Sequence, residues 1–129
     1  MKLVKDVMVT DIIRISAFAK IREALSLMKR HNVKSLVVDR QSEHDAWGLI
    51  TYTNIVKTII AEDGDIDLLN VFDACAKPVI SIGESLNARH AASLMIRYRV
   101  KRLLVLENNE LRGLLVMDDL MTALLDNID

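Results

Sequence analysis

The chain contains an internal repeat, and this repeat limits the folds that it can adopt. Residues 4–38 align with residues 71–105 at an offset of 67 positions, and 14 of the 35 aligned pairs are identical. After a two-residue contraction the offset becomes 65, which places Gly48 on Gly113. The chain therefore consists of two copies of one unit. We expect the following division within one compact module: a first unit over residues 1–61, an acidic linker over 62–70 and a second unit over 71–129.

Each copy has the apolar patterning of the same elements. Apolar residues recur at i, i+3, i+4 and i+7 over residues 21–28 and 88–95, which predicts an amphipathic helix in each copy. Asn87 is a favourable N-cap for the second helix, whereas the matching Lys20 is a poor one. The remaining predicted elements are buried strands over 33–39 and 100–106, further strands over 48–51 and 111–116 joined in copy two by an Asn108-Asn109 turn, and final helices over 55–60 and 120–125.

The expected fold is α/β, with the order strand, helix, strand, strand, helix in each copy. One copy would leave an apolar sheet face and two helix stripes uncovered. We therefore expect two β-α-β-β-α units that are related by a pseudo-twofold axis and packed through their small sheets. Clefts between paired units are common places for small ligands to bind.

Composition favours a soluble globular protein of the cytoplasm. The chain is 51% hydrophobic with a net charge of −1, which excludes disorder by composition. Its single cysteine, Cys75, cannot close an intrachain disulfide, and no opening segment has the order of a secretory signal. Charged residues interrupt every apolar run before it reaches the roughly 18 residues of a membrane helix. The sequence therefore predicts no membrane contact.

Several short motifs together resemble a known family. The motif Asp6-Val7-Met8, the helix from Arg22 to Met28, the strand 36–39 and the segment 48–54 look like a CBS domain, and the second copy repeats them. The chain thus resembles a tandem CBS pair, or Bateman module, over nearly its whole length. This resemblance implies a regulatory module without catalysis. Such a module binds an adenosine-containing ligand (AMP, ADP, ATP, NAD or S-adenosylmethionine) in clefts between the two copies and often forms a homodimer.

The resemblance places a ribose-binding acid at the end of a G-x-x-[ST]-x-x-D pattern, which in copy two is Asp119. A carboxylate after a strand and at a helix start can accept hydrogen bonds from both ribose hydroxyls. Local chemistry alone favours an ordinary helix N-cap. Val116 replaces the usual hydroxyl residue of the pattern. The expected residues of this second cleft are Lys77, Pro78, Val79, Lys101, Arg102, Val116, Met117, Asp118 and Asp119.

Copy one departs from the pattern in the opposite way. Thr51 keeps the hydroxyl, but Asn54 replaces the acid, so the ribose contact loses its charge-assisted strength. We therefore expect weaker binding at the first cleft. The alternative is that Asn54 simply caps its helix and the cleft is empty. The expected residues of the first cleft are Thr10, Asp11, Ile12, Lys34, Ser35, Thr51, Thr53 and Asn54.

Basic residues before the middle strand of each copy are expected to bind phosphate. They are Lys34 in copy one and the pair Lys101 and Arg102 in copy two, and arginine can hold a phosphate through two parallel hydrogen bonds. A solvated helix end is the alternative for any isolated basic cluster. By resemblance, the adenine ring would lie against residues 10–12 or 77–79, where Pro78 has a fixed φ.

No metal site or catalytic constellation is predicted. His31, His44 and His90 are too far apart for a local metal motif, and Cys75 has no second cysteine. The sequence has no G-x-x-x-x-G-K loop and no nucleophile elbow. We therefore expect no enzymatic activity and no cofactor besides the regulatory ligand.

Two other functions stay open. A dimerisation or adaptor domain that has lost ligand binding would explain the departures at Asn54 and Val116. Nucleic-acid binding is less favoured, because only 4% of the residues are aromatic and could stack on bases; it would use Arg97, Arg99, Lys101 and Arg102. We expect Ile59 and Leu124 to be exposed and to form the homodimer contact, and an unidentified regulated protein to be a further partner.

Overall fold

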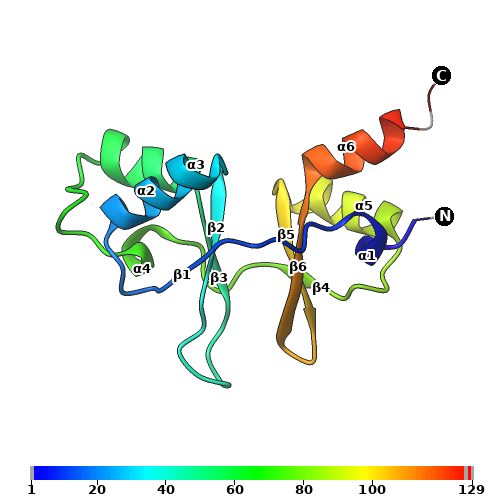
Figure 1. Cartoon of the computed structure of the whole chain (residues 1–129), viewed down its shortest axis with the longest axis horizontal. Coiled ribbons are helices and arrows are strands. Elements are labelled where there is room, and N and C mark those ends of the chain that lie inside the picture. The colour runs from blue at the N-terminus through cyan, green and yellow to red at the C-terminus, as the bar shows by residue number, and fades with distance from the viewer. Residues whose placement is uncertain (1, 127, 129) are drawn as a thin grey trace. The chain divides into compact units, whose positions relative to one another are not determined.

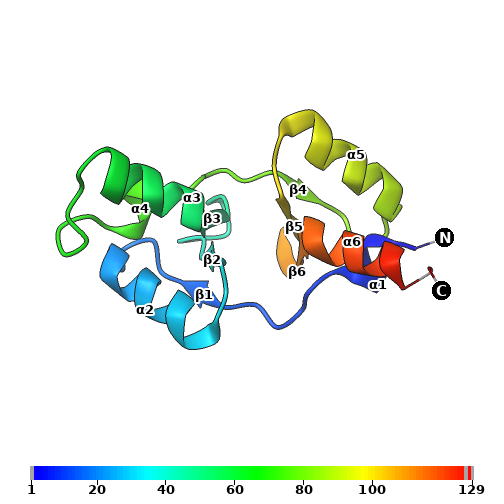
Figure 2. The same cartoon turned by 90° about the horizontal axis from the view of Figure 1, so that it is seen from above.

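The computed structural model describes residues 2–126 and 128. The chain divides into two compact units, one of Ile13–Val79 and one that combines Met1–Ile12 with Ile80–Asp129. Each unit has one three-stranded sheet with helices beside it (Figures 1 and 2). The expected α/β class and the two small sheets are confirmed.

In the unit of residues 13–79, the sheet has the order β1-β2-β3. β2 lies in the centre, parallel to β1 and antiparallel to β3. The elements in chain order are β1 (Arg14–Ile15), α2 (Ile21–His31), β2 (Ser35–Val38), β3 (Gly48–Thr51), α3 (Tyr52–Ile55), the π-helix η1 (Val56–Ala61) and α4 (Val71–Ala74).

The other unit repeats this topology. Its sheet has the order β4-β5-β6, with β5 parallel to β4 and antiparallel to β6. The elements in chain order are α1 (Val4–Val7), β4 (Ser81–Ile82), α5 (Ala88–Tyr98), β5 (Arg102–Glu107), β6 (Glu110–Val116) and α6 (Met117–Leu125).

The local signals of the sequence agree with the observed helix ends and turn. Asn87 caps α5, where its side-chain oxygen accepts a hydrogen bond from the Arg89 amide at 2.9 Å, whereas Lys20 makes no side-chain cap for α2. Asn108 and Asn109 both adopt positive φ in the turn between β5 and β6. These predictions are confirmed.

The final helix of the first copy differs from the one predicted. After one turn of α-helix it continues as the π-helix η1, whereas the matching α6 is α-helical throughout. The segment 56–60 contains Val56, Thr58, Ile59 and Ile60. Such a run of β-branched side chains crowds an α-helix and restricts χ1, which the Leu, Met and Ala residues of α6 do not.

The short helices α1 and α4 were not predicted, and each packs in the unit of the other repeat. Val4 of α1 is fully buried in the core around Met95 and Leu103, and Val71 of α4 is fully buried in the core around Met28. Figures 1 and 2 show α1 beside α5 and α6, far from it in sequence. Each hydrophobic core is therefore completed by the first helix of the other repeat.

This exchange predicts that the first residues stabilise the C-terminal half. We expect Val4→Ser to lower the free energy of unfolding by about 2 kcal/mol, because a fully buried valine side chain is replaced by a polar one. Chemical denaturation measures the change, and Lys5→Ser at the neighbouring exposed position is the matched control. Equal stability of the two variants would contradict the exchange.

Candidate functional site

One end of the β4-β5-β6 sheet brings predicted ligand-binding residues together. Arg102 at the start of β5 is the ladder partner of Val116 at the end of β6, and the Met117 amide donates to the Lys101 carbonyl at 2.9 Å. α6 begins at Met117, so Asp119 lies in its first turn. Two basic residues and the candidate ribose-binding acid therefore come from the same end of one sheet.

Asp119 is half-buried and has no internal partner. Among the described residues, no hydrogen bond or ion pair involves its carboxylate. Partial burial raises the pKa of the Asp119 carboxyl, and the charge of Asp118 raises it further. The N-cap of α6 is Val116, which makes no side-chain cap, so Asp119 is the third helical residue and not the cap. Its acceptor oxygens are left for a group outside the chain.

A polar pocket of about 270 Å³ lies beside Asp119. Thr122 on α6 and Asp126 directly after this helix contribute to its wall, and Lys2 and Asp6 come from the N-terminal segment. The Asp6 carboxylate already accepts a hydrogen bond from the Leu3 amide at 2.9 Å. The sequence did not indicate this neighbourhood, because it depends on the packing of α1 in the unit of the other repeat.

Asn54, which matches Asp119 in the first copy, already has hydrogen-bond partners within the chain. The Thr51 amide donates to Asn54 Oδ1 at 3.0 Å, and the Asn54 amide donates to Thr51 Oγ1 at 3.3 Å. This reciprocal capping box satisfies the start of α3. Asn54 therefore helps to cap α3, as one part of the alternative expected, whereas an empty first cleft stays a prediction. The two repeats differ: Asn54 is used within the fold, whereas Asp119 is not.

The basic residue of the first copy has the same backbone setting as that of the second. Ser35 is the ladder partner of Thr51, and the Tyr52 amide donates to the Lys34 carbonyl at 3.1 Å. The side chains of Lys34 and Thr53 are exposed. The repeat therefore reproduces the sheet end, with one basic side chain in place of two.

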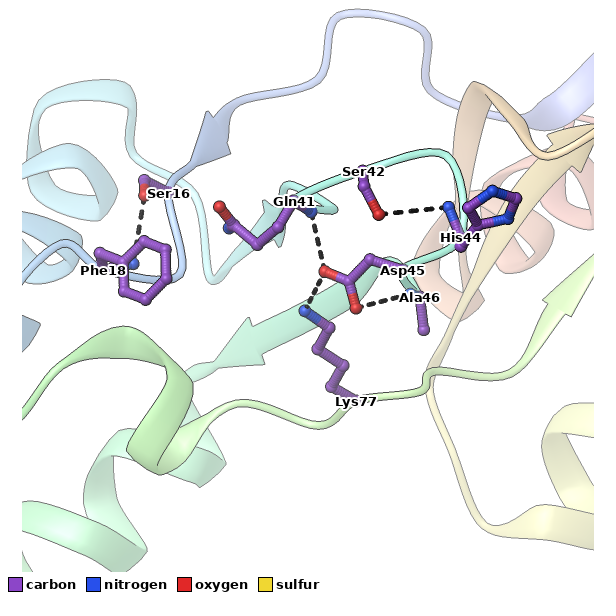
Figure 3. Close-up of polar contacts among 8 residues, drawn as sticks. All are labelled: Ser16, Phe18, Gln41, Ser42, His44, Asp45, Ala46 and Lys77. Atoms are coloured by element: carbon purple, nitrogen blue, oxygen red, sulfur yellow. Dashed lines mark hydrogen bonds and ion pairs between the residues drawn. The ribbon is translucent and has the colours of Figure 1, made fainter.

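Lys77 forms an ion pair that the sequence did not reveal. Its Nζ lies 2.7 Å from Asp45 Oδ2, and the Asp45 carboxylate also accepts hydrogen bonds from the amides of Gln41 and Ala46 (Figure 3). These hydrogen bonds lower the pKa of the Asp45 carboxyl, and the one from Lys77 has the largest effect. Lys77 thus ties the loop between β2 and β3 to the segment after α4.

The two segments expected to contact adenine follow α1 and α4, the short helices that each complete the core of the other repeat. Val9 and Leu114 exchange two backbone hydrogen bonds, which puts Thr10, Asp11 and Ile12 in the unit that contains Asp119. Ala76 and Leu49 do the same, which puts residues 77–79 in the unit that contains Asn54. Each predicted set of ligand residues therefore has members in both units.

An apolar groove of about 400 Å³ runs between α1, α5 and α6. Ala92, Met121 and Leu124 line it, and Leu124 is exposed as expected. The expectation of an exposed Ile59 is wrong: this side chain is partly buried and packs against the core that contains Ile55, because η1 turns it inward.

The described part of the chain offers no other chemistry of the kinds considered. Within residues 2–126 and 128, no group of three or more His, Cys, Asp or Glu side chains could hold a metal ion. No helix in these residues has both the length and the apolar character needed to cross a bilayer. Burial raises the pKa of the Cys75 thiol, which disfavours the reactive thiolate.

Comparisons with known proteins agree with the repeat. The CBS domain family model matches residues 4–61 and again residues 71–126. The CBS domain-containing protein YhcV of Bacillus subtilis is 29% identical over 127 residues, which cover 98% of this chain and 89% of that protein.

Solved structures show the same fold. A hexameric CBS-CP12 protein from bloom-forming cyanobacteria superposes with a TM-score of 0.89 at 26% identity, over 93% of this chain and 66% of that one. The CBS domain pair of protein MJ0100, solved with 5-methylthioadenosine and S-adenosyl-L-methionine, gives a TM-score of 0.82 at 23% identity, over 95% of this chain and 99% of that one. Since the family model matches both repeats and the fold is that of CBS pairs, the chain belongs to the CBS domain family and carries two copies of the domain.

Proposed function

We propose that this CBS pair is a regulatory module that binds an adenosine-containing ligand and performs no catalysis of its own. The observation that carries the proposal is the Asp119 carboxylate, which is half-buried at the start of α6 and has no partner in the described part of the chain. Removing a charged group from water costs free energy unless a hydrogen bond replaces the lost water contacts. A ligand that donates two hydroxyls would supply that compensation.

The groups around Asp119 suit the separate parts of a nucleotide. Its two carboxylate oxygens can accept hydrogen bonds from the neighbouring ribose hydroxyls. Lys101 and Arg102 at the same end of the sheet provide donors for a phosphate. Neither basic side chain has a hydrogen-bond or ion-pair partner among the described residues. Residues 10–12 and 77–79 remain the proposed adenine walls.

The two copies are proposed to bind with unequal strength. Asn54 and Thr51 already satisfy each other, so a ligand at the first copy would have to compete with their hydrogen bonds. At the second copy, Asp119 offers a charged acceptor without such competition. The MJ0100 pair of the same fold holds two adenosine compounds, which supports this class of ligand.

The ligand would regulate by favouring one arrangement of the protein over another. A ligand can shift such an equilibrium only by its difference in affinity for the two arrangements. We propose a homodimer that senses this shift and covers the apolar groove lined by Ala92, Met121 and Leu124. The regulated protein and the cytoplasmic location stay predictions.

Ligand-induced stabilisation tests the proposal. We expect at least one of AMP, ADP, ATP, NAD and S-adenosylmethionine to raise the melting temperature and to bind in calorimetry, because selective binding to the folded state stabilises it. The signal should saturate, and guanosine nucleotides at equal concentration are the control. A ligand with a micromolar Kd, tested at about a thousand times that concentration, would raise the free energy of unfolding by about 4 kcal/mol. If no adenosine compound binds at this concentration, the proposal fails. An intact dimer would then favour the adaptor function.

A further inference from the structure

Two stretches of this nearly neutral chain each carry charges of a single sign. Residues 62–73 contain five acidic and no basic residues, whereas residues 86–106 contain five basic and no acidic residues. The two stretches lie in different compact units. A net charge of −1 therefore conceals one acidic and one basic stretch of sequence.

The acidic stretch lies beside an exposed aromatic pair. Phe18 and Phe72 are the only two phenylalanines of the chain, and their rings meet edge to face with centroids 5.9 Å apart. Phe18 is 64% exposed, and Leu68 within the acidic stretch is 72% exposed. The Phe18 amide donates to Ser16 Oγ at 3.1 Å, which fixes the turn that presents this ring (Figure 3). We call Phe18, Leu68, Phe72, Asp65 and Asp73 the acidic-aromatic surface.

The fold does not require these aromatic residues. In the other repeat the matching positions are Ser85 and Lys5, yet the backbone is the same: the Lys5 amide donates to the Glu84 carbonyl at 2.9 Å, as the Phe72 amide donates to the Ala17 carbonyl at 3.0 Å. A serine and a lysine are compatible with this geometry. Two large exposed apolar rings at one repeat alone are therefore better explained by a contact outside the chain.

The two acids of this surface, Asp65 and Asp73, form no ion pair among the described residues. Asp67 is neutralised by a two-pronged ion pair with Arg22. Asp65 and Asp73, in contrast, accept hydrogen bonds only from the backbone amides of Asp67 and Asn70, and no cation pairs with them among the described residues. The surface thus combines apolar rings with two available negative charges.

The end of α5 has the complementary character. Arg97, Tyr98 and Arg99 are consecutive and exposed, and Arg99 leaves the helix in a left-handed conformation. No ion pair involves either arginine in the described part of the chain. Arginine and tyrosine are the residues that most often carry protein interfaces, and arginine stacks on aromatic rings. We call these three residues the basic end of α5.

We propose that the acidic-aromatic surface of one copy of this protein binds the basic end of α5 of a second copy. The complementarity of charge and of aromatic character selects this occupant. Because the two surfaces differ, the contact is head-to-tail: a single contact leaves the basic end of one copy and the acidic-aromatic surface of the other free, so assembly continues until a ring of two or more copies closes. This contact does not depend on a bound ligand and differs from the groove proposed for the homodimer.

Complementation between two variants tests the contact. Phe72→Ser removes one surface, and the double variant Arg97→Gln/Tyr98→Ser removes the other. We expect each variant alone to weaken the head-to-tail contact by at least about tenfold, as for a central interface residue. An equimolar mixture should restore one contact, between the intact basic end of the first variant and the intact acidic-aromatic surface of the second. Sedimentation at rising concentration measures all three, with Val56→Ser as the matched exposed control.

The outcomes separate this inference from the ligand proposal. Wild-type assembly should weaken in about 1 M salt, where the Debye length is about 3 Å. The inference is overturned if wild type stays monomeric, if the variants assemble as wild type does, or if the mixture restores nothing while both variants keep their melting temperatures. Loss of DNA-oligonucleotide binding in the basic-end variant, with unchanged assembly, would assign that end to nucleic acid. Ligand binding by a protein that does not assemble would leave the proposed function standing.

Discussion

At neutral pH, Asp119→Asn is expected to bind the adenosine ligand about tenfold to a hundredfold more weakly than wild type, because hydrogen bonds to a charged group contribute about 1.5–3 kcal/mol. The substitution keeps the shape of the side chain and one acceptor oxygen. It removes the charge and replaces the second oxygen with an amide nitrogen, which donates and cannot accept a hydrogen bond from a ribose hydroxyl. Calorimetric titration of both proteins measures the difference.

The same carboxylate should make binding depend on pH. Burial and Asp118 raise the pKa of Asp119 above its ordinary value, and the ionised form is the one that accepts both ribose hydroxyls. Affinity should therefore fall as pH drops through the raised pKa and the carboxylate takes up a proton. Adenosine is the suitable probe, since it has no phosphate that titrates, over about pH 4.5 to 7.5. Asp119→Asn should bind equally across this range.

The stability of the unliganded protein should respond in the opposite sense. A raised pKa means that the folded state holds the Asp119 proton more tightly than the unfolded state does. Stability from this group therefore rises as pH falls from the raised pKa toward the ordinary carboxyl value, and Asp119→Asn at neutral pH should be at least as stable as wild type. Glu62→Gln, at an exposed carboxylate outside both predicted clefts, is the control and should leave affinity unchanged. Equal losses of affinity in the two variants would contradict the special role of Asp119.

Much of the fold could be predicted because repeated local signals agree with it. The apolar spacing of residues 21–28 and 88–95, the cap at Asn87 and the Asn108-Asn109 turn all act over a few neighbouring residues. Such local signals could not predict that α1 and α4 each pack in the unit of the other repeat. Val4 and Val71 recur at the repeat offset, but matching positions do not tell in which of two similar cores each side chain is buried.

In the candidate site, too, features set by neighbouring residues could be predicted, and contacts between distant residues could not. The pairing of the strand that contains Arg102 with the strand that contains Val116 follows from the strand pattern, and a capping role is one expectation for Asn54. The Lys77–Asp45 ion pair joins residues 32 positions apart, and the loop that holds Asp45 has no counterpart of equal length in the other copy. Neither the apolar periodicity nor the internal repeat of the sequence indicates such a contact.

Gly113→Ala is expected to destabilise the protein by about 1–3 kcal/mol, the cost of forcing extra atoms into a packed site. A Cβ on Gly113 would lie 2.9 Å from the Val9 carbonyl oxygen and 2.6 Å from Met8 Sδ. The thioether could move, but the carbonyl belongs to the backbone segment that exchanges two hydrogen bonds with Leu114. The glycine therefore permits the close approach that holds α1 in its unit.

Hydrogen exchange separates this effect from a general loss of stability. In Gly113→Ala the amide hydrogens of Val9 and Leu114 should exchange with solvent faster than those in the centre of β5. The reason is that the new Cβ clashes with the segment after α1 that contains Val9. Gly83→Ala is the matched control, since its new Cβ would approach only a side-chain atom, the Glu107 carboxylate oxygen at 3.1 Å, and no backbone atom. If both variants unfold at the same denaturant concentration, the N-terminal segment does not depend on Gly113. A selective effect would instead explain why the repeat has glycine at both Gly48 and Gly113, where the segment that leaves α4 or α1 crosses the last strand of a sheet.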